Sequence, residues 1–167
     1  MKISKLLPLI GFLLVALICN AQKPRYIITD NFEGVAFPLI PRLRAEDVKN
    51  EFMPSVKDIM KLEKKISDSL SFIVSAYMKS ESLRYTGGRY ELQCDIIENL
   101  KKYKRQYTGF IINGEKMIII RFYLYPQGNW KEEILGPSEN SGCVEFLIYY
   151  EVGCGKLFNF FTDLSPM

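Results

Sequence analysis

Residues 107–125 read YTGFIINGEKMIIIRFYLY, and this stretch decides the fold. Its centre is Asn113-Gly114, a dipeptide that favours a type I′ turn because both central residues of that turn need positive φ. The flanking residues are apolar and rich in the β-branched and aromatic types that strands prefer. The stretch therefore predicts a β-hairpin with strands at about 107–112 and 116–125.

The residues of the second strand divide between the two faces of a sheet, because side chains alternate along a strand. One face receives Ile118, Ile120, Phe122 and Leu124, and the other receives Met117, Ile119, Arg121, Tyr123 and Tyr125. Downstream, residues 126–142 have the composition of a polar loop. Residues 143–152 alternate again, Gly153-Cys154-Gly155 predicts a turn, and residues 157–161 predict a last strand. Residues 105–162 thus predict a four-stranded antiparallel meander.

Upstream of the hairpin the apolar spacing changes from two to 3.6 residues. Ser55 with Asp58 three residues later resembles a capping box, and apolar side chains then recur on one helical face as far as Tyr77. This pattern predicts a helix over 55–79, and a similar stripe predicts a second helix over 89–103. Helices followed by an antiparallel meander indicate an α+β fold with both helices packed on one face of the sheet.

The N-terminus has the three zones of a secretory signal peptide. Lys2 and Lys5 precede an uncharged run over 6–18, and Ala21 ends a short A-x-A-like site. The run is shorter than the roughly 20 residues of a membrane-spanning helix. We expect cleavage after Ala21 and export to the periplasm or the medium, with no transmembrane helix left after cleavage. The alternative is a lipid anchor on Cys19.

The rest of the chain has the size and composition of one domain. We expect an irregular segment over 22–53 with a short edge strand near 26–29, one α+β domain over 54–162 and a tail over 163–167. The signal peptide holds two of the 22 basic residues and none of the 19 acidic ones, which leaves a net charge of +1. This balance gives no reason to expect nucleic-acid binding.

Three cysteines follow the predicted cleavage site, namely Cys94, Cys143 and Cys154. An exported chain can form a disulfide, and the odd number leaves at least one thiol free or paired between molecules. Cys143 and Cys154 fall at opposite ends of one predicted strand and are too far apart to bridge. The pairing of Cys94 stays open at this point.

The chain contains no histidine, which removes several classes of catalytic site. Ser-His-Asp and Cys-His nucleophile systems and His-based metal sites all require that side chain. The sequence also has no phosphate-binding glycine loop and no EF-hand loop. We therefore expect no cofactor and no metal.

Several short motifs make the sequence resemble a group of small exported bacterial proteins of unassigned function. They are Phe52-Met53-Pro54-Ser55 before the first helix, the run over 103–110 that reads YKRQYTGF, Trp130, and Gly142-Cys143. The resemblance spans about 52–160 and implies a shared, cystatin-like fold with a helix laid over a curved sheet. Asn140-Ser141-Gly142 departs from the Asp-Gly-Gly-like turn expected in that group. The resemblance implies no catalytic residue.

Two groups of side chains are candidate binding residues. Arg121, Tyr123, Tyr125 and Tyr149 would share the sheet face turned away from the helices, and tyrosine and arginine are enriched where proteins meet partners. This face is either covered by residues 22–53 or exposed as a binding surface, and the sequence leaves both alternatives open. Lys104 and Arg105 belong to a basic cluster that would either hold an acidic partner or complement a helix C-terminus.

The sequence therefore favours a non-enzymatic binding or inhibitory module of the bacterial cell envelope, with an unknown protein or glycan as partner. One alternative is a carboxylate-dependent glycan hydrolase that uses Glu132, Glu133 or Glu139 beside Trp130. A purely structural envelope protein is the other alternative.

Overall fold

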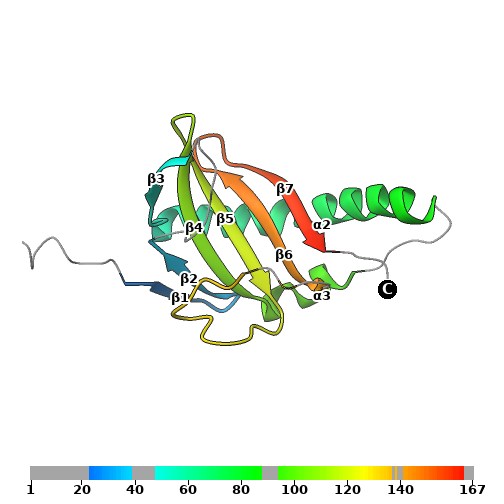
Figure 1. Cartoon of the computed structure of the whole chain (residues 1–167), viewed down its shortest axis with the longest axis horizontal. Coiled ribbons are helices and arrows are strands. Elements are labelled where there is room, and N and C mark those ends of the chain that lie inside the picture. The colour runs from blue at the N-terminus through cyan, green and yellow to red at the C-terminus, as the bar shows by residue number, and fades with distance from the viewer. Residues whose placement is uncertain (1–22, 39–47, 88–93, 137, 139–140, 164–167) are drawn as a thin grey trace, which may run out of the picture.

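A computed structural model of the chain describes residues 23–38, 48–87, 94–136, 138 and 141–163. The predicted α+β class is confirmed, with one long helix behind a mostly antiparallel sheet (Figure 1). The predicted signal peptide, its cleavage site, Cys19 and most of the predicted C-terminal tail lie outside the described residues.

The sheet has seven strands in the order β1-β2-β4-β5-β6-β7, and β3 pairs with β4 beside this path. The strands are β1 (Arg25–Ile28), β2 (Glu33–Phe37), β3 (Val48–Phe52), β4 (Lys104–Ile112), β5 (Glu115–Tyr123), β6 (Gly142–Glu151) and β7 (Lys156–Asp163). The expected meander is present as β4–β7. The predicted count of four strands was wrong, because three strands from the N-terminal segment join the same sheet.

These three strands complete the free edge of β4. β2 pairs with its first half in parallel, β3 pairs with its second half antiparallel, and β1 forms the outer edge beside β2. The expected edge strand near 26–29 is therefore confirmed as β1, whereas the irregular structure expected for the rest of 22–53 is wrong at β2 and β3. The short run Gly34-Val35-Ala36-Phe37 before Pro38 could have predicted β2. All four residues of this run are buried.

The β4–β5 hairpin forms as predicted. Asn113 has φ 50° and Gly114 has φ 84°, as a type I′ turn requires. Nine residue pairs run from Ile112↔Glu115 to Lys104↔Tyr123 without a register shift. Because the register is regular, every second side chain of these two strands lies on the same face of the sheet.

The first predicted helix is α2, which spans Val56–Thr86. The Ser55 hydroxyl accepts a hydrogen bond of 3.1 Å from the Asp58 backbone N–H, which confirms the predicted cap. The helix does not end near residue 80 as expected, because Glu81 and Ser82 continue the buried stripe. Polar residues in this last stretch therefore face the protein, and the helix ends at Gly87 with φ 61°.

The second predicted helix is much shorter than expected. α3 spans Ile96–Asn99, and the 3₁₀ turn η1 spans Leu100–Lys102. Residues 88–93, where this helix was expected to begin, lie outside the described residues. Tyr103 is already extended, and its hydroxyl donates a hydrogen bond of 2.5 Å to the Cys143 carbonyl. This contact fixes the chain in an extended conformation before β4.

The main core lies between α2 and the sheet face that it covers. From α2 it contains Ile59, Leu62, Ile66, Leu70, Val74 and Met78. From the sheet it contains Tyr107, Ile118, Ile120, Phe122, Phe146, Ile148 and Tyr150. The predicted assignment of Ile118, Ile120 and Phe122 to one buried face is therefore confirmed.

A buried charge pair joins α2 to β4 within this core. Arg105 Nε lies 3.2 Å from Glu63 Oε1, and the two side chains are only 3% and 8% exposed. The Tyr107 hydroxyl donates a hydrogen bond of 2.7 Å to the same carboxylate oxygen. Burial raises the pKa of Glu63, although Arg105 and Tyr107 act in the opposite direction.

The neighbours of Arg105 are mostly apolar. Its guanidinium lies over the rings of Phe32 and Phe122, at 4.9 and 5.3 Å from the ring centroids. Nη2 donates to the Leu100 carbonyl at 3.3 Å. Neither Nε nor Nη1 has a hydrogen-bond partner in the described part of the chain, so Nε meets Glu63 as an ion pair without hydrogen-bond geometry. Arg105 is thus held by one carboxylate, one carbonyl and two aromatic faces.

Replacing Gly114 with valine tests the hairpin. A β-branched residue resists positive φ, so we expect Gly114→Val to lower the free energy of unfolding by about 1–2 kcal/mol or more in urea denaturation. The control is Gly136→Val, because Gly136 has no positive φ and its Cβ would meet nothing within 4 Å. Equal stability of the two variants would contradict a type I′ turn.

Candidate functional site

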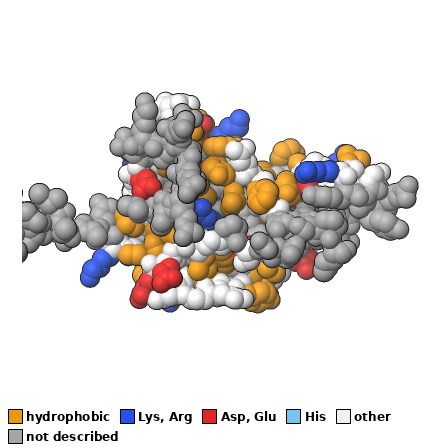
Figure 2. All heavy atoms as spheres, in the orientation of Figure 1, with side chains coloured by type: hydrophobic (Ala, Val, Ile, Leu, Met, Phe, Trp, Pro, Cys, Tyr) orange, Lys and Arg blue, Asp and Glu red, His pale blue; other side chains and the backbone are white. Residues whose placement is uncertain are grey.

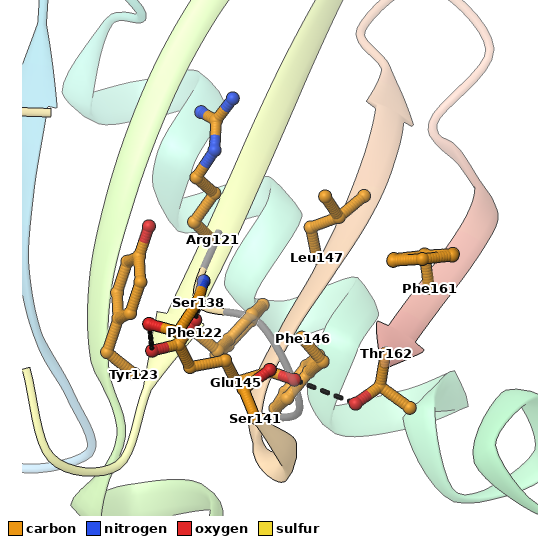
Figure 3. A pocket seen from close by; sticks show the side chains of 10 residues that line it. All are labelled: Arg121, Phe122, Tyr123, Ser138, Ser141, Glu145, Phe146, Leu147, Phe161 and Thr162. Carbon is orange, nitrogen blue, oxygen red and sulfur yellow. Dashed lines mark hydrogen bonds between the residues drawn. The ribbon is translucent and has the colours of Figure 1, made fainter. Parts of the chain in front are cut away.

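The register of the meander places a row of side chains across the outer face, by which we mean the sheet face turned away from α2. Arg121 pairs with Gln106 of β4 and with Leu147 of β6, and Leu147 pairs with Phe161 of β7. Figure 3 shows Arg121, Leu147 and Phe161 side by side on three neighbouring strands. In the space-filling view, hydrophobic side chains gather over β6 and β7 (Figure 2).

A bulge in β7 brings Phe161 into this row. Tyr149 pairs with Phe158 and Leu147 pairs with Phe161, so two steps along β6 match three along β7. Asn159 absorbs the extra residue with φ 49°. Phe158 and Phe161 therefore both lie on the outer face, and Phe161 remains 55% exposed.

A cavity of about 290 Å³ lies along this row, and we call it the outer-face groove. Its lining residues are Arg121, Phe122, Tyr123, Ser138, Ser141, Glu145, Phe146, Leu147, Phe161 and Thr162 (Figure 3). Most of the lining is apolar, and its two charged members are Arg121 and Glu145.

The acidic side of the groove is already satisfied by hydrogen bonds. Ser138 donates to the Glu145 carboxylate through its backbone N–H at 3.0 Å and through its hydroxyl at 2.7 Å. The buried Thr162 hydroxyl lies within hydrogen-bond distance of the carbonyl oxygens of Gly142 and Glu145. These bonds fix the beginning of β6 against the end of β7 and keep this wall of the groove in place.

The basic side of the groove is less satisfied. Arg121 Nη1 donates one hydrogen bond of 3.3 Å to Thr108 Oγ1. Within the described ranges, Arg121 forms no ion pair. A guanidinium has five N–H donors, so most donors of Arg121 have no acceptor among the residues that the structure describes.

The loop after β5 is held against the outer face by two buried side chains. The Gln106 amide donates to the carbonyls of Trp130 and Glu133, both at 2.7 Å, and its oxygen accepts from the Leu135 N–H at 2.9 Å. The Tyr123 hydroxyl donates to the Leu135 carbonyl at 3.0 Å. Burial raises the pKa of Tyr123, so its hydroxyl stays protonated and can act as this donor.

The six candidate binding residues do not form one surface. Arg121 lines the groove, and Tyr123 does so from a buried position, at 3% exposure. Tyr149 is half-buried on the outer face, where its ring packs against Phe110 and Phe158. Tyr125 lies beyond the end of β5 and is 72% exposed. Tyr125 is not among the residues that line the groove.

The two basic candidates lie elsewhere. Arg105 was expected at a surface, and this was wrong, because its position on β4 turns it into the core opposite Glu63. Lys104 Nζ donates to Glu33 Oε2 at 2.5 Å, and Lys131 Nζ lies 3.5 Å from the other oxygen of Glu33. The hydrogen bond from Lys104 is the main reason why the pKa of Glu33 lies below its usual value.

The described residues of the alternative hydrolase hypothesis, Glu132 and Glu133, do not line the outer-face groove. Glu132 accepts a hydrogen bond of 2.6 Å from the Asn129 side chain, and the Glu133 side chain is exposed. Glu139 lies outside the described residues. Three cavities of the described structure each have one lining carboxylate, which is Glu145, Glu98 or Glu51. Within the described ranges, no group of three or more acidic or cysteine side chains could hold a metal ion.

The open question of cysteine pairing has an answer in the structure. Cys94 and Cys143 form a disulfide with a Cα–Cα distance of 5.8 Å, and Cys154 is free and exposed. The bridge ties the chain before α3 to the start of β6, next to the hydrogen bond from Tyr103 to Cys143.

No helix in the described part of the chain is both long and apolar enough to cross a lipid bilayer. No protein-family model, curated protein or solved structure matches this chain.

Removing the disulfide is expected to cost stability. Because the bridge closes a loop across 49 residues, Cys94→Ser/Cys143→Ser should lower the free energy of unfolding by about 2–4 kcal/mol. Urea denaturation under oxidising conditions measures this. Cys154→Ser is the matched control and should change nothing. If Cys154→Ser cost as much as the double variant, the assigned pairing would be wrong.

Proposed function

We propose that this chain is an exported, non-enzymatic binding or inhibitory module of the cell envelope, and that it meets its partner through the outer-face groove. The observation that carries the proposal is the row Arg121–Leu147–Phe161, in which a cation that forms no ion pair with the described residues lies beside exposed apolar surface. Exposed apolar patches and arginine side chains are both common where proteins meet their partners.

Two features support export. The first is the signal-peptide pattern over 1–21. The second is the Cys94–Cys143 disulfide, because such bridges persist in oxidising compartments such as the bacterial periplasm.

Two features favour binding over catalysis. The chain has no histidine, the side chain most often used for proton transfer in enzymes. A glycosidase needs two carboxyl groups about 5–9.5 Å apart across its cleft, and the outer-face groove is lined by Glu145 alone among the described carboxylates. Glu145 is also engaged by Ser138.

We also infer a cystatin-like arrangement for the part of the chain from α2 onward. A long helix precedes the four-stranded meander β4–β7 and packs across one face of it. This leaves the other face for a partner, as the proposed function requires.

Cross-linking in cells that express the full chain tests the proposed surface. A photoreactive phenylalanine analogue at Phe161 should form covalent adducts with an envelope component. The control is the same analogue at Phe72, which is 78% exposed on α2, behind the sheet. Adducts at Phe161 should also decrease when Leu147→Asp is added, because a buried charge would oppose apolar contact. Equal adducts from both positions, or none at Phe161, would contradict the proposal.

A further inference from the structure

The outer-face groove is at the lower end of the size range of small-molecule pockets, and its rim is open. Pockets that enclose a free small molecule usually measure about 300–1,000 Å³ and bury most of its surface. The groove measures about 290 Å³, and Phe161 on its rim is 55% exposed. A ligand here would therefore insert one apolar group over Leu147 and Phe161 and keep the rest of its body outside.

The charged side chains of the groove indicate which chemical group a ligand should have beside its apolar group. Glu145 receives two hydrogen bonds from Ser138, whereas Arg121 gives one to Thr108 and forms no ion pair with the described residues. Glu145 keeps its negative charge, but its oxygens are already engaged, whereas most donors of Arg121 have no acceptor among the described residues. A planar guanidinium matches a carboxylate through two parallel hydrogen bonds.

The position of β7 explains how a longer chain could leave the groove. Within the described part of the structure, β7 pairs only with β6, so its other edge has no strand partner. Phe161 lies on this edge strand. Extended peptides commonly bind beside such an edge, where side-chain pockets select individual residues.

Taking the proposed function as its basis, we propose that the outer-face groove binds the C-terminal residue of a polypeptide, with an apolar side chain over Leu147 and Phe161 and its terminal carboxylate on Arg121. One residue then supplies both the apolar group and an anion that can accept the donors of Arg121. The remainder of the partner stays outside and continues past Phe161.

Fluorescence anisotropy with defined peptides tests this assignment on the purified full-length chain. The probe is a fluorescein-labelled pentapeptide of alternating glycine and serine that ends in phenylalanine. The form with a free carboxylate should bind roughly 10- to 100-fold more tightly than the C-terminally amidated form, as expected for charge-assisted hydrogen bonds. Arg121→Gln should abolish this preference, and Phe161→Ser should weaken both forms.

The matched controls are Lys57→Gln, which removes an exposed cation from α2, and Phe72→Ser, which removes an exposed aromatic ring. Both should bind the peptides as the unaltered chain does. Equal affinity for acid and amide, a preference that survives Arg121→Gln, or no binding at millimolar peptide would overturn the assignment. N-acetylphenylalanine should compete with the peptide, because the proposed groove contacts all lie in the last residue; failure to compete would overturn the assignment too. If the assignment fails while cross-linking at Phe161 persists, the proposed binding surface stands with another ligand.

Discussion

The buried contact between Glu63 and Arg105 fixes how β4 lies against α2, and the rest of the structure depends on it. Two charges in a dry core depend on each other, because the loss of either leaves the other buried and unpaired, and here the Tyr107 hydroxyl adds a hydrogen bond to Glu63. A shift of β4 by one residue would turn Arg105 and Tyr107 outward and leave Glu63 buried without a partner. The pair is therefore expected to select one register of β4 on the helix.

That register determines the outer face. Because Arg105 and Tyr107 point toward the helix, Gln106 between them and Thr108 after them point away from it. Gln106 then holds the loop after β5, and Thr108 accepts the hydrogen bond that orients Arg121. The β4–β5 and β5–β6 pairings have no register shift, so Leu147 of β6 lies on the same face as Arg121 of β5. The bulge at Asn159 places Phe161 of β7 on that face too. The groove thus follows from the placement of the core.

The sequence predicted the features that local patterns encode, which are the Asn113-Gly114 hairpin, the Ser55 cap, the alternation of β5 and the α+β class. It did not reveal the partners of β4, because pairing with β2 and β3 joins residues about 60–70 positions apart and leaves no short-range period. Arg105 was misjudged for a related reason, since its alternation with Tyr107 marks an inward position only once Glu63 is known to face it. Within the candidate site, Arg121 was predicted. Phe161 was not, because it reaches the outer face through the bulge at Asn159, and no local pattern in the sequence of β7 predicts that bulge.

A double-mutant cycle on Glu63 and Arg105 tests the central claim most directly. We expect Glu63→Leu and Arg105→Met each to lower the free energy of unfolding in urea by about 3–5 kcal/mol, because each leaves one buried charge without its partner. The double variant replaces both charges with apolar groups, and we expect it to be more stable than either single variant. If the two losses instead add in the double variant, the pair does not act as a unit, and the register of β4 must be set by other contacts.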